Sequence, residues 1–352
     1  MTGGPPTGTM RAAVLHGPAD LRIEDRAVPA PDDNEVVIEV SHCGICGTDL
    51  HMVVEGWGRP GSVGGHEWSG TIVDVGSGVD GLSAGDQVVG GVTPACGACD
   101  LCRADRPSLC LERAQPGTDN PDGAFARYVK MTARGVVRVP DGLDLRTAAL
   151  AEPLAVSLHA VHRGGAKAGD RVLVTGAGPI GALAIVALRA LGVTDIVVSE
   201  PSPARQDLAR RLGASQVVEP GDLEIPSIAE PSRVVDGAVD VALECSGKAS
   251  AMLAACAQLK RGGTMVIVGT GIEGPQFDPN RILLNELTVT GAFEYDARGI
   301  EHAVELLASG AADVSDLVEP TDVGLDGLLD AMKDLAAGKV AGKVLVRPGG
   351  DT

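Results

Sequence analysis

The chain has 352 residues, a length that favours two domains because a single hydrophobic core rarely grows beyond about 250–300 residues. Apolar residues make up 44% of the chain and charged residues 22%, proportions that argue against a disordered or fibrous protein. The net charge of -18 argues against nucleic acid as a partner, since phosphate backbones are bound by clustered Lys and Arg. No apolar run reaches the roughly 18–20 residues of a bilayer span, and the first residues, MTGGPPTGTM, do not resemble a leader, so we predict no membrane association and a cytoplasmic protein.

The first half of the sequence predicts short β-strands. Residues 10–28, 35–44 and 68–92 combine runs rich in Val and Ile with Gly and Asp at the breaks. This pattern is typical of the short strands of a barrel or a sandwich. We therefore expect a β-rich first domain.

From about residue 170, strand-like and helix-like runs alternate. The expected elements are, in chain order, a strand at 170–178, a helix at 179–192, a strand at 195–200 and a helix at 202–214. The alternation continues through 239–247, 250–263, 264–271 and 287–293, followed by helices at 297–310 and 325–340 and a strand at 342–348. Such alternation implies βαβ units and a parallel sheet. We predict an α/β fold class with a parallel sheet, and the change in composition along the chain predicts domain boundaries near residues 154 and 294.

The stretch ACGACDLCRADRPSLC places four cysteines within fifteen residues, at Cys96, Cys99, Cys102 and Cys110. In a reducing compartment, closely spaced cysteines are more often metal ligands than disulfides. Four thiolates can close a tetrahedral zinc site that keeps no open position for a substrate. The spacing therefore predicts a structural zinc ion, with unligated thiols, a redox dithiol and an iron–sulfur site as the alternatives.

Two glycine-flanked turns, CGICGTDLH and GGHEWSG, carry Cys46, His66 and Glu67. Catalytic zinc commonly has three protein ligands and keeps a fourth position for water or substrate, and Cys46 and His66 are candidates for two of these ligands. Glu152 precedes a proline at the predicted junction of the two domains, where ligand sites are frequent. It is a candidate for the third ligand and Glu67 is its competitor; the alternative for either glutamate is a solvated surface charge.

The sequence VLVTGAGPIG has Gly176, Gly178 and Gly181 in a G-x-G-x-x-G pattern, directly after an apolar strand and at the start of a helix. The glycines allow a tight turn and a close approach of the backbone, and the helix N-terminus offers free N–H groups to a pyrophosphate. The GAGPIG turn, which includes Pro179 and Ile180, is therefore predicted to bind a dinucleotide.

Glu200 ends the next predicted strand, within range of the acidic residue that binds a ribose 2′-hydroxyl in such folds. A carboxylate at this place repels a 2′-phosphate, so NAD is favoured over NADP. Arg205 keeps NADP open, because an arginine near this position can accommodate the phosphate.

In their order along the chain, these motifs resemble those of the zinc-dependent medium-chain alcohol and polyol dehydrogenases, and the resemblance extends from Met10 onward. Its most specific parts are the four-cysteine spacing and the joint order of the motifs. It implies a GroES-like catalytic domain formed by both ends of the chain, at 1–153 and 295–352. A Rossmann coenzyme domain with a doubly wound parallel sheet, at 154–294, is then inserted between them. Glu152, where many simple alcohol dehydrogenases have a third cysteine, makes the sequence look more like the sorbitol, butanediol and threonine dehydrogenase branch.

The resemblance also implies roles for the matching residues. Cys46, His66 and Glu152 match the catalytic zinc positions, and Glu67 matches a neighbouring carboxylate that supports or replaces a ligand. The four closely spaced cysteines match a structural zinc site. One catalytic and one structural zinc ion per chain are thus expected.

Thr48 and His51 match the hydroxyl and the imidazole of the family's proton relay. The expected reaction is hydride transfer between a secondary alcohol, diol or polyol and NAD, which gives the ketone. The expected partners are a small-molecule alcohol or ketone and further copies of the chain, in a homodimer or homotetramer. Two other functions stay open: a non-catalytic sensor that binds zinc and a dinucleotide, and a zinc-free reductase of the same superfamily.

Overall fold

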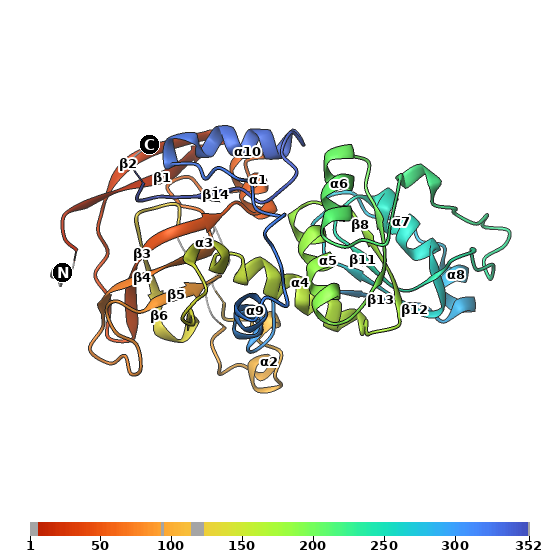
Figure 1. Ribbon diagram of the computed structural model, residues 1–352, viewed down its shortest axis with the longest axis horizontal. Helices are drawn as coiled ribbons and strands as arrows, with labels where there is room; N and C mark the ends of the chain where they lie inside the picture. Colours follow the sequence, from red (N-terminus) through yellow and green to blue (C-terminus); the bar gives the residue numbers. More distant parts are fainter. Residues whose placement is uncertain (1–5, 93–94, 114–122, 351–352) are drawn as a thin grey trace. The chain divides into compact units, whose positions relative to one another are not determined.

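The computed structural model describes residues 6–92, 95–113 and 123–350. These residues form two compact units (Figure 1). The first unit contains the described parts of Met1–Glu152, Ile300–Ala308 and Val318–Thr352, and the second contains Pro153–Gly299 and Ser309–Leu317.

The first unit is built on antiparallel strands. Two of them, β1 (Thr9–Gly17) and β2 (Asp20–Ala27), pair with each other. The others form a sheet in the order β14-β3-β4-β5-β7, in which β6 also pairs with β3. Their bounds are β3 (Glu35–Gly44), β4 (Glu67–Val75), β5 (Gln87–Gly90), β6 (Tyr128–Thr132), β7 (Val136–Arg138) and β14 (Leu345–Val346).

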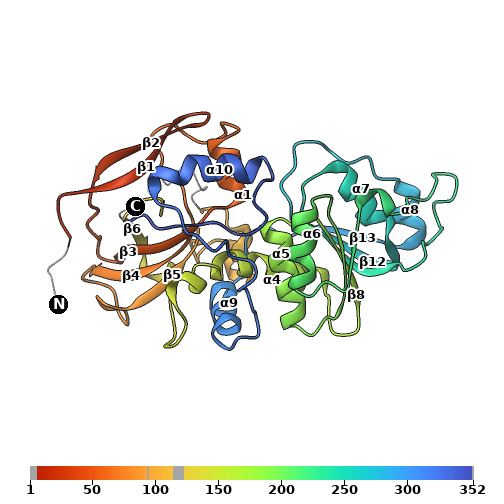
Figure 2. The same ribbon diagram turned by 45° about the horizontal axis from the view of Figure 1, so that its top comes forward.

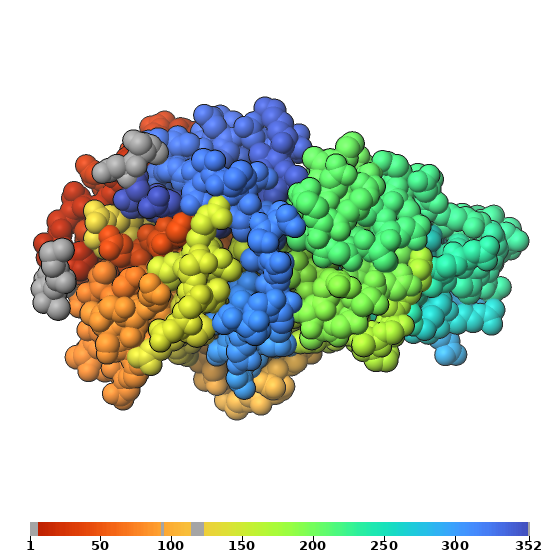
Figure 3. Space-filling view, viewed as in Figure 1, coloured from red at the N-terminus to blue at the C-terminus, as the bar shows by residue number. Residues whose placement is uncertain are grey.

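Segments from both ends of the chain lie side by side in this sheet. Leu345 and Val346 of β14 pair with Gly44 and Cys43 of β3. In Figure 3 the late segments of the chain, in blue, lie against the red and orange surface of the early strands. The β-rich unit is therefore complete only when residues more than 300 positions apart have met.

The core of the first unit lies between its strands and helix α10 (Leu328–Ala336). Trp68 and Phe125 are fully buried, and Leu328 and Met332 of α10 belong to the same apolar cluster. Apolar residues at this spacing form one face of a helix, which explains why α10 is helical and why it packs here. The other helices of the unit are α1 (Gly47–Val53), α2 (Asp100–Arg103), α3 (Leu145–Ala148) and α9 (Gly299–Ala308).

The second unit is a six-stranded parallel sheet in the order β10-β9-β8-β11-β12-β13. Its strands are β8 (Arg171–Thr175), β9 (Asp195–Ser199), β10 (Gln216–Val218), β11 (Val239–Glu244), β12 (Leu259–Ile267) and β13 (Thr288–Gly291). The chain winds from β8 outward to β10, returns to β11 and winds outward to β13. This doubly wound arrangement confirms the predicted fold class of this part of the chain.

Helices cover both faces of the parallel sheet. Helices α5 (Pro179–Ala190) and α6 (Pro203–Arg211) lie on one face, and α7 (Ala249–Ala257) and α8 (Pro279–Asn285) lie on the other (Figures 1 and 2). Helix α4 (Ala151–Gly164) precedes β8. Strands that are covered on both faces read as continuous apolar runs, which is why β8 carries Val172, Leu173 and Val174 in succession, all buried.

Two predicted helices are shorter than expected. The helix predicted at 325–340 is α-helical only over Leu328–Ala336, after a 3-10 turn at Leu325–Gly327. The pattern predicts a helix at 250–263, but α7 ends at Ala257 and β12 already begins at Leu259. Gly262 and Gly263 stand in the second half of this segment, and glycine gives a helix little support. The extra length joins the strand, where β12 pairs with β11 across a shift of register between Val239 and Val241.

Candidate active site

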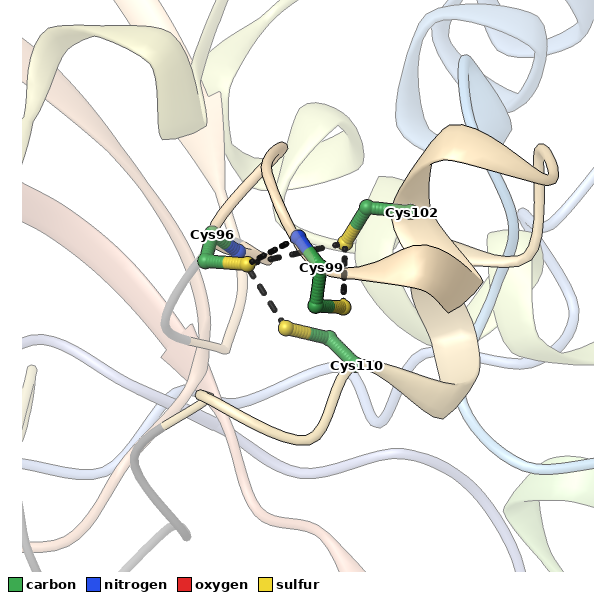
Figure 4. Close-up of side chains that lie close together, drawn as sticks. All are labelled: Cys96, Cys99, Cys102 and Cys110. Atoms are coloured by element: carbon green, nitrogen blue, oxygen red, sulfur yellow. Dashed lines mark hydrogen bonds between the residues drawn. The ribbon is translucent and has the colours of Figure 1, made fainter.

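The four closely spaced cysteines form one cluster. The sulfur atoms of Cys96, Cys99, Cys102 and Cys110 all lie within 4.8 Å of one another (Figure 4). Four sulfurs bound to one zinc ion at about 2.3 Å in a tetrahedron lie about 3.8 Å apart. The Sγ atoms of Cys99 and Cys102 are 3.5 Å apart and those of Cys96 and Cys102 are 3.9 Å apart. The donor set therefore fits a closed zinc site.

Backbone N–H groups point at these sulfurs. The N–H groups of Ala98 and Cys99 donate to Cys96 Sγ at 3.3 and 3.2 Å, and the N–H of Cys96 donates to Cys110 Sγ at 3.3 Å. A donated hydrogen bond stabilises the thiolate, and the N–H of Cys102 lowers the pKa of Cys99 to about 6. Loss of hydration and the neighbouring Cys99 raise the pKa of Cys102 to about 12. The loop thus favours at least one thiolate, the form that binds metal.

A second cluster joins the two glycine-flanked turns. Cys46 precedes helix α1, and His66 and Glu67 stand at the start of β4. The Cys46 sulfur, a ring nitrogen of His66 and a carboxylate oxygen of Glu67 lie within 4.8 Å of one another. The structure thus brings together three of the residues predicted to bind catalytic zinc, and sulfur, imidazole and carboxylate are ligands that zinc accepts.

Asp49 fixes the two turns relative to each other. Its carboxylate accepts a hydrogen bond from the N–H of Cys46 at 2.9 Å and another from the N–H of Gly65 at 3.3 Å. It also lies 4.0 Å from Nδ1 of His66. Asp49 is itself buried, so it connects the backbones of the two turns that carry Cys46 and His66 without reaching solvent.

Glu67 is bound to a buried lysine. The Nζ of Lys343 lies 2.7 and 2.5 Å from the two carboxylate oxygens of Glu67, and it also donates to the carbonyl of Ile45 at 3.0 Å. Both side chains are 1% exposed. Gly44, which pairs with Glu67 across β3 and β4, makes the contact possible, because a Cβ at this position would lie 2.1 Å from a Glu67 oxygen.

Glu152 faces the same cluster from the start of α4. It is buried, and it does not belong to the group of ligand atoms within 4.8 Å. Burial, together with the nearby charge of Glu67, raises the pKa of Glu152 to about 7 although His66 and Lys343 oppose this. Burial alone would lower the pKa of His66, but Cys46, Asp49 and Glu152 raise it well above its ordinary value. The site thus concentrates negative charge, which a divalent cation would neutralise.

Thr48 and His51 are three residues apart on α1 and therefore lie on one side of it. His51 has two neighbours that fix its ring. Its Nδ1 lies 2.9 Å from a carboxylate oxygen of Glu55, and its ring stacks on Trp57 with centroids 4.8 Å apart and planes 15° apart. Because a carboxylate only accepts, this contact places the proton on Nδ1 and leaves the lone pair of Nε2 available.

The GAGPIG turn connects β8 to α5. Gly176 has a positive φ of 84°. Gly178 is the N-cap of α5, and Pro179 is the first residue of the helix. A Cβ on Gly181 would lie 1.9 Å from the carbonyl oxygen of Gly176, so that position has room only for glycine. The turn therefore brings the helix N-terminus, including Ile180, close to the end of the strand, as pyrophosphate binding requires.

Glu200 is held at the end of β9 beside this turn. Its carboxylate accepts hydrogen bonds from the N–H groups of Ala177 at 2.7 Å and Ser202 at 2.8 Å. Each oxygen keeps a further lone pair for a ligand hydroxyl. Arg205 follows on α6, and its buried Nε has no hydrogen-bond partner among the residues that the structure describes.

Sequence reasoning missed Asp49 and Lys343. A signal existed for each: Asp49 stands three residues after Cys46, where the carboxylate can reach back to the turn, and Lys343 is a charged residue in the apolar run GKVLV. Neither signal identifies a partner, because the contact of Lys343 with Glu67 spans 276 positions of the chain.

Comparison with known protein families agrees with this arrangement. Residues 32–141 match the family described as Alcohol dehydrogenase GroES-like domain, and residues 179–309 match the family Zinc-binding dehydrogenase. The chain belongs to the zinc-dependent medium-chain alcohol and polyol dehydrogenases, and it is an oxidoreductase of that family. The predicted GroES-like and Rossmann fold is confirmed.

Particular relatives cover nearly the whole chain. Sorbitol dehydrogenase of Bacillus subtilis (strain 168) is 35% identical over 334 residues, which are 92% of this chain and 93% of that protein. The crystal structure of 2R,3R-butanediol dehydrogenase from Bacillus subtilis has a TM-score of 0.85 and 34% identity, covering 97% of this chain and 100% of that one. A zinc-binding dehydrogenase from Sinorhizobium meliloti 1021, bound to NADP, has a TM-score of 0.85 and 31% identity over 97% of this chain and 100% of that one.

Among the described residues, the helices are all too short or too polar to cross a membrane.

Proposed function

We propose that this protein is a zinc-dependent dehydrogenase that oxidises a secondary hydroxyl of a polyol or vicinal diol to the ketone with NAD. The observation that carries the proposal is the convergence of Cys46, His66 and a carboxylate next to the helix that bears Thr48 and His51. The similarity to a sorbitol dehydrogenase and a butanediol dehydrogenase favours polyols and diols as the substrate class.

For the catalytic zinc we propose Cys46, His66 and Glu152 as ligands. Glu67 is the competitor with the shorter distances, but both of its oxygens already bind the ammonium of Lys343. Glu152 is buried and feels the charges of His66 and Lys343, but no Lys or Arg among the described residues forms an ion pair with it. A zinc ion held by these three residues would keep one position open.

The reaction needs polarisation of the alcohol, removal of its proton and acceptance of its hydride. A zinc ion held by Cys46, His66 and Glu152 would supply the first by lowering the pKa of a bound hydroxyl, and a bound nicotinamide would supply the hydride acceptor. The hydroxyl of Thr48 takes the alcohol proton and passes it toward Nε2 of His51. Glu55 and Trp57 hold the His51 ring in the tautomer that receives a proton at Nε2. His51 then releases the proton to solvent, which its partial exposure allows.

NAD is the proposed coenzyme. The carboxylate of Glu200 is fixed beside the glycine turn, where it would accept a hydrogen bond from a ribose hydroxyl and would repel a 2′-phosphate. Arg205 is the candidate contact for a 2′-phosphate, so NADP is the coenzyme to test against NAD. The pyrophosphate would bind at the N-terminus of α5.

The four-cysteine cluster is the proposed site of a structural zinc ion, which gives two zinc ions per chain. We also propose that the domains divide near residues 153 and 294, that the enzyme is a homodimer or homotetramer, and that it acts in the cytoplasm. The β-rich part is then the catalytic domain and the parallel sheet the coenzyme domain.

The test is the absorbance of reduced nicotinamide during reaction of the purified protein with NAD and, separately, with NADP. The substrates are polyols, vicinal diols, threonine and simple secondary alcohols, each with and without a chelator, and zinc is counted by elemental analysis. Chelator-sensitive reduction of NAD by polyols or diols is expected, with two zinc ions per chain. If the folded protein holds one tightly bound zinc ion and a dinucleotide but reduces no coenzyme with any substrate, the result would favour a sensor. Activity without zinc would favour a zinc-free reductase.

A further inference from the structure

A second buried carboxylate stands at the end of a central strand of the parallel sheet. Glu244 is the last residue of β11, is 0% exposed and is aligned with Thr175, the last residue of β8. β8 and β11 are the two strands from which the sheet winds in opposite directions. In sheets of this kind the ligand crevice lies at the carboxyl ends of those two strands. Glu244 is therefore at the base of the expected dinucleotide crevice.

The carboxylate of Glu244 binds the turn that follows it. Oε1 accepts hydrogen bonds from the N–H of Ser246 at 2.8 Å, from its hydroxyl at 2.5 Å and from the N–H of Gly247 at 3.1 Å. The N–H of Gly247 also lies 3.2 Å from Oε2. Successive backbone N–H groups in a turn form a small anion-binding concavity. Here the protein fills that concavity with its own carboxylate.

The turn at Ser246 and Gly247 is pressed between two glycine turns. A Cβ on Gly176, in the GAGPIG turn after β8, would lie 2.8 Å from Cβ of Ser246. A Cβ on Gly269, after β12, would lie 2.3 Å from the N atom of Gly247. The three turns therefore pack with no room for a side chain between them, and a displacement of the middle turn must displace the GAGPIG turn.

We propose that Glu244 is a positioning residue for the coenzyme. It holds the Ser246–Gly247 turn as the wall of the crevice against which the GAGPIG turn takes its binding geometry. Glu200, at the end of β9 on the other side of β8, holds the GAGPIG turn directly, because it accepts a hydrogen bond from the N–H of Ala177. The proposal rests on the proposed dinucleotide binding of this unit, and it adds a residue that touches neither zinc nor substrate.

The test compares Glu244→Gln with a matched variant of the same strand. Asp240 lies at the opposite end of β11, where its carboxylate accepts the N–H of Arg171 at 2.9 Å and pairs with Lys260. Asp240→Asn therefore makes the same chemical change at the edge of the sheet remote from the crevice. The measurement is the dissociation constant of NADH by nicotinamide fluorescence, followed by the KM values for NAD and for the alcohol.

A glutamine at position 244 has only one accepting oxygen. If that oxygen keeps the three donors, the NH2 group faces the N–H of Gly247, and two donors then oppose each other. We expect Glu244→Gln to weaken NADH binding by about tenfold and to raise the KM for NAD by a similar factor. The KM for the alcohol and the zinc content should stay as in the unmodified protein, and Asp240→Asn should bind NADH normally. A merely structural role of Glu244 would lower the stability of the variant without this selective loss of NADH affinity.

Ser246→Ala removes one of the hydrogen bonds and provides a milder variant if Glu244→Gln fails to fold. It should weaken NADH binding about threefold. NADH affinity unchanged within about twofold in folded Glu244→Gln or, failing that variant, in Ser246→Ala would overturn the proposal, because RT ln 2 is below the effect of a single hydrogen bond. If the unmodified protein binds neither NADH nor NADPH, the proposed function itself is wrong; normal binding by the unmodified protein with unchanged affinity in the variants refutes the role of Glu244 alone.

Discussion

The ammonium group of Lys343 lies 2.5 Å from one carboxylate oxygen of Glu67 and 2.7 Å from the other. Neither side chain reaches solvent. The pair sits beside Cys46 and His66, and it leaves Glu67 as a neutralised neighbour of the proposed metal site. This contact explains how a second carboxylate can lie next to the proposed zinc without being needed as a ligand.

Removing the lysine alone should be costly. Lys343→Met leaves Glu67 buried without a counter-charge, and we expect the free energy of unfolding to fall by about 3–5 kcal/mol. Denaturant unfolding in the presence of zinc measures the change. The double variant Lys343→Met with Glu67→Gln removes both charges and should recover most of the loss. A single-variant loss below about 1 kcal/mol would contradict the importance of the pair.

The pairing of His51 with Glu55 should matter for turnover. If His51 passes the proton, His51→Gln should lower kcat by about 10²-fold, and Glu55→Gln by roughly tenfold, because the ring loses the partner that fixes its tautomer. The control is Glu24→Gln, since Glu24 also bonds an exposed histidine, His16, at 2.5 Å. Steady-state kinetics with saturating substrate decide the matter. Equal kcat values for the two glutamate variants would remove Glu55 from the relay.

The four-cysteine loop should depend on its metal. Cys99→Ser is expected to reduce the zinc content from two ions per chain to one and to expose the loop to trypsin at the Arg103–Ala104 bond. Elemental analysis and limited proteolysis report the two effects separately. Cys256→Ala removes a buried thiol outside both clusters and should retain both ions. A Cys99→Ser protein that keeps two zinc ions would disprove the closed site.

Coenzyme choice should respond to Glu200. Glu200→Gln removes the charge that repels a 2′-phosphate while it keeps the size of the side chain. We expect kcat/KM for NAD to fall about tenfold and the NADP/NAD ratio to rise by more than that. Glu219→Gln, a neighbouring acidic residue that accepts from Gln206, is the control. An unchanged NADP/NAD ratio in Glu200→Gln would assign coenzyme choice to other residues.

Much of the fold follows from local patterns in the sequence. The alternation of apolar strands and helices predicts the parallel sheet because each element reveals its own period, and β8, α5, β9 and α6 lie where the pattern puts them. Helix α7 ends earlier than predicted, at Ala257, and the segment that contains Gly262 and Gly263 belongs to β12 instead. The candidate metal ligands are predicted by the joint order of the motifs, because a cysteine and a histidine twenty residues apart, such as Cys46 and His66, are by themselves more often structural.

The partners of those ligands are not predictable in the same way. Asp49, Lys343 and Glu244 are ordinary charged residues by sequence, and their roles come from burial against distant segments. Lys343 meets Glu67 only through the pairing of β14 with β3. A pattern within a dozen residues carries no information about such a contact. The same limit applies to the choice between Glu67 and Glu152, because it depends on which carboxylate finds a counter-charge.

The pairing of β14 with β3 also sets the order in which the molecule can be completed during synthesis. A ribosome adds about 5–20 residues per second, and it releases the whole parallel-sheet unit before Lys343, Leu345 and Val346 emerge. Until then Glu67 lacks the counter-charge of Lys343, and the end of β3 at Cys43 and Gly44 lacks its pairing with β14. A chain interrupted before Lys343 would hold every proposed zinc ligand and the dinucleotide turn, yet it would lack the closing strand, and cellular proteases would meet it as an unfinished protein.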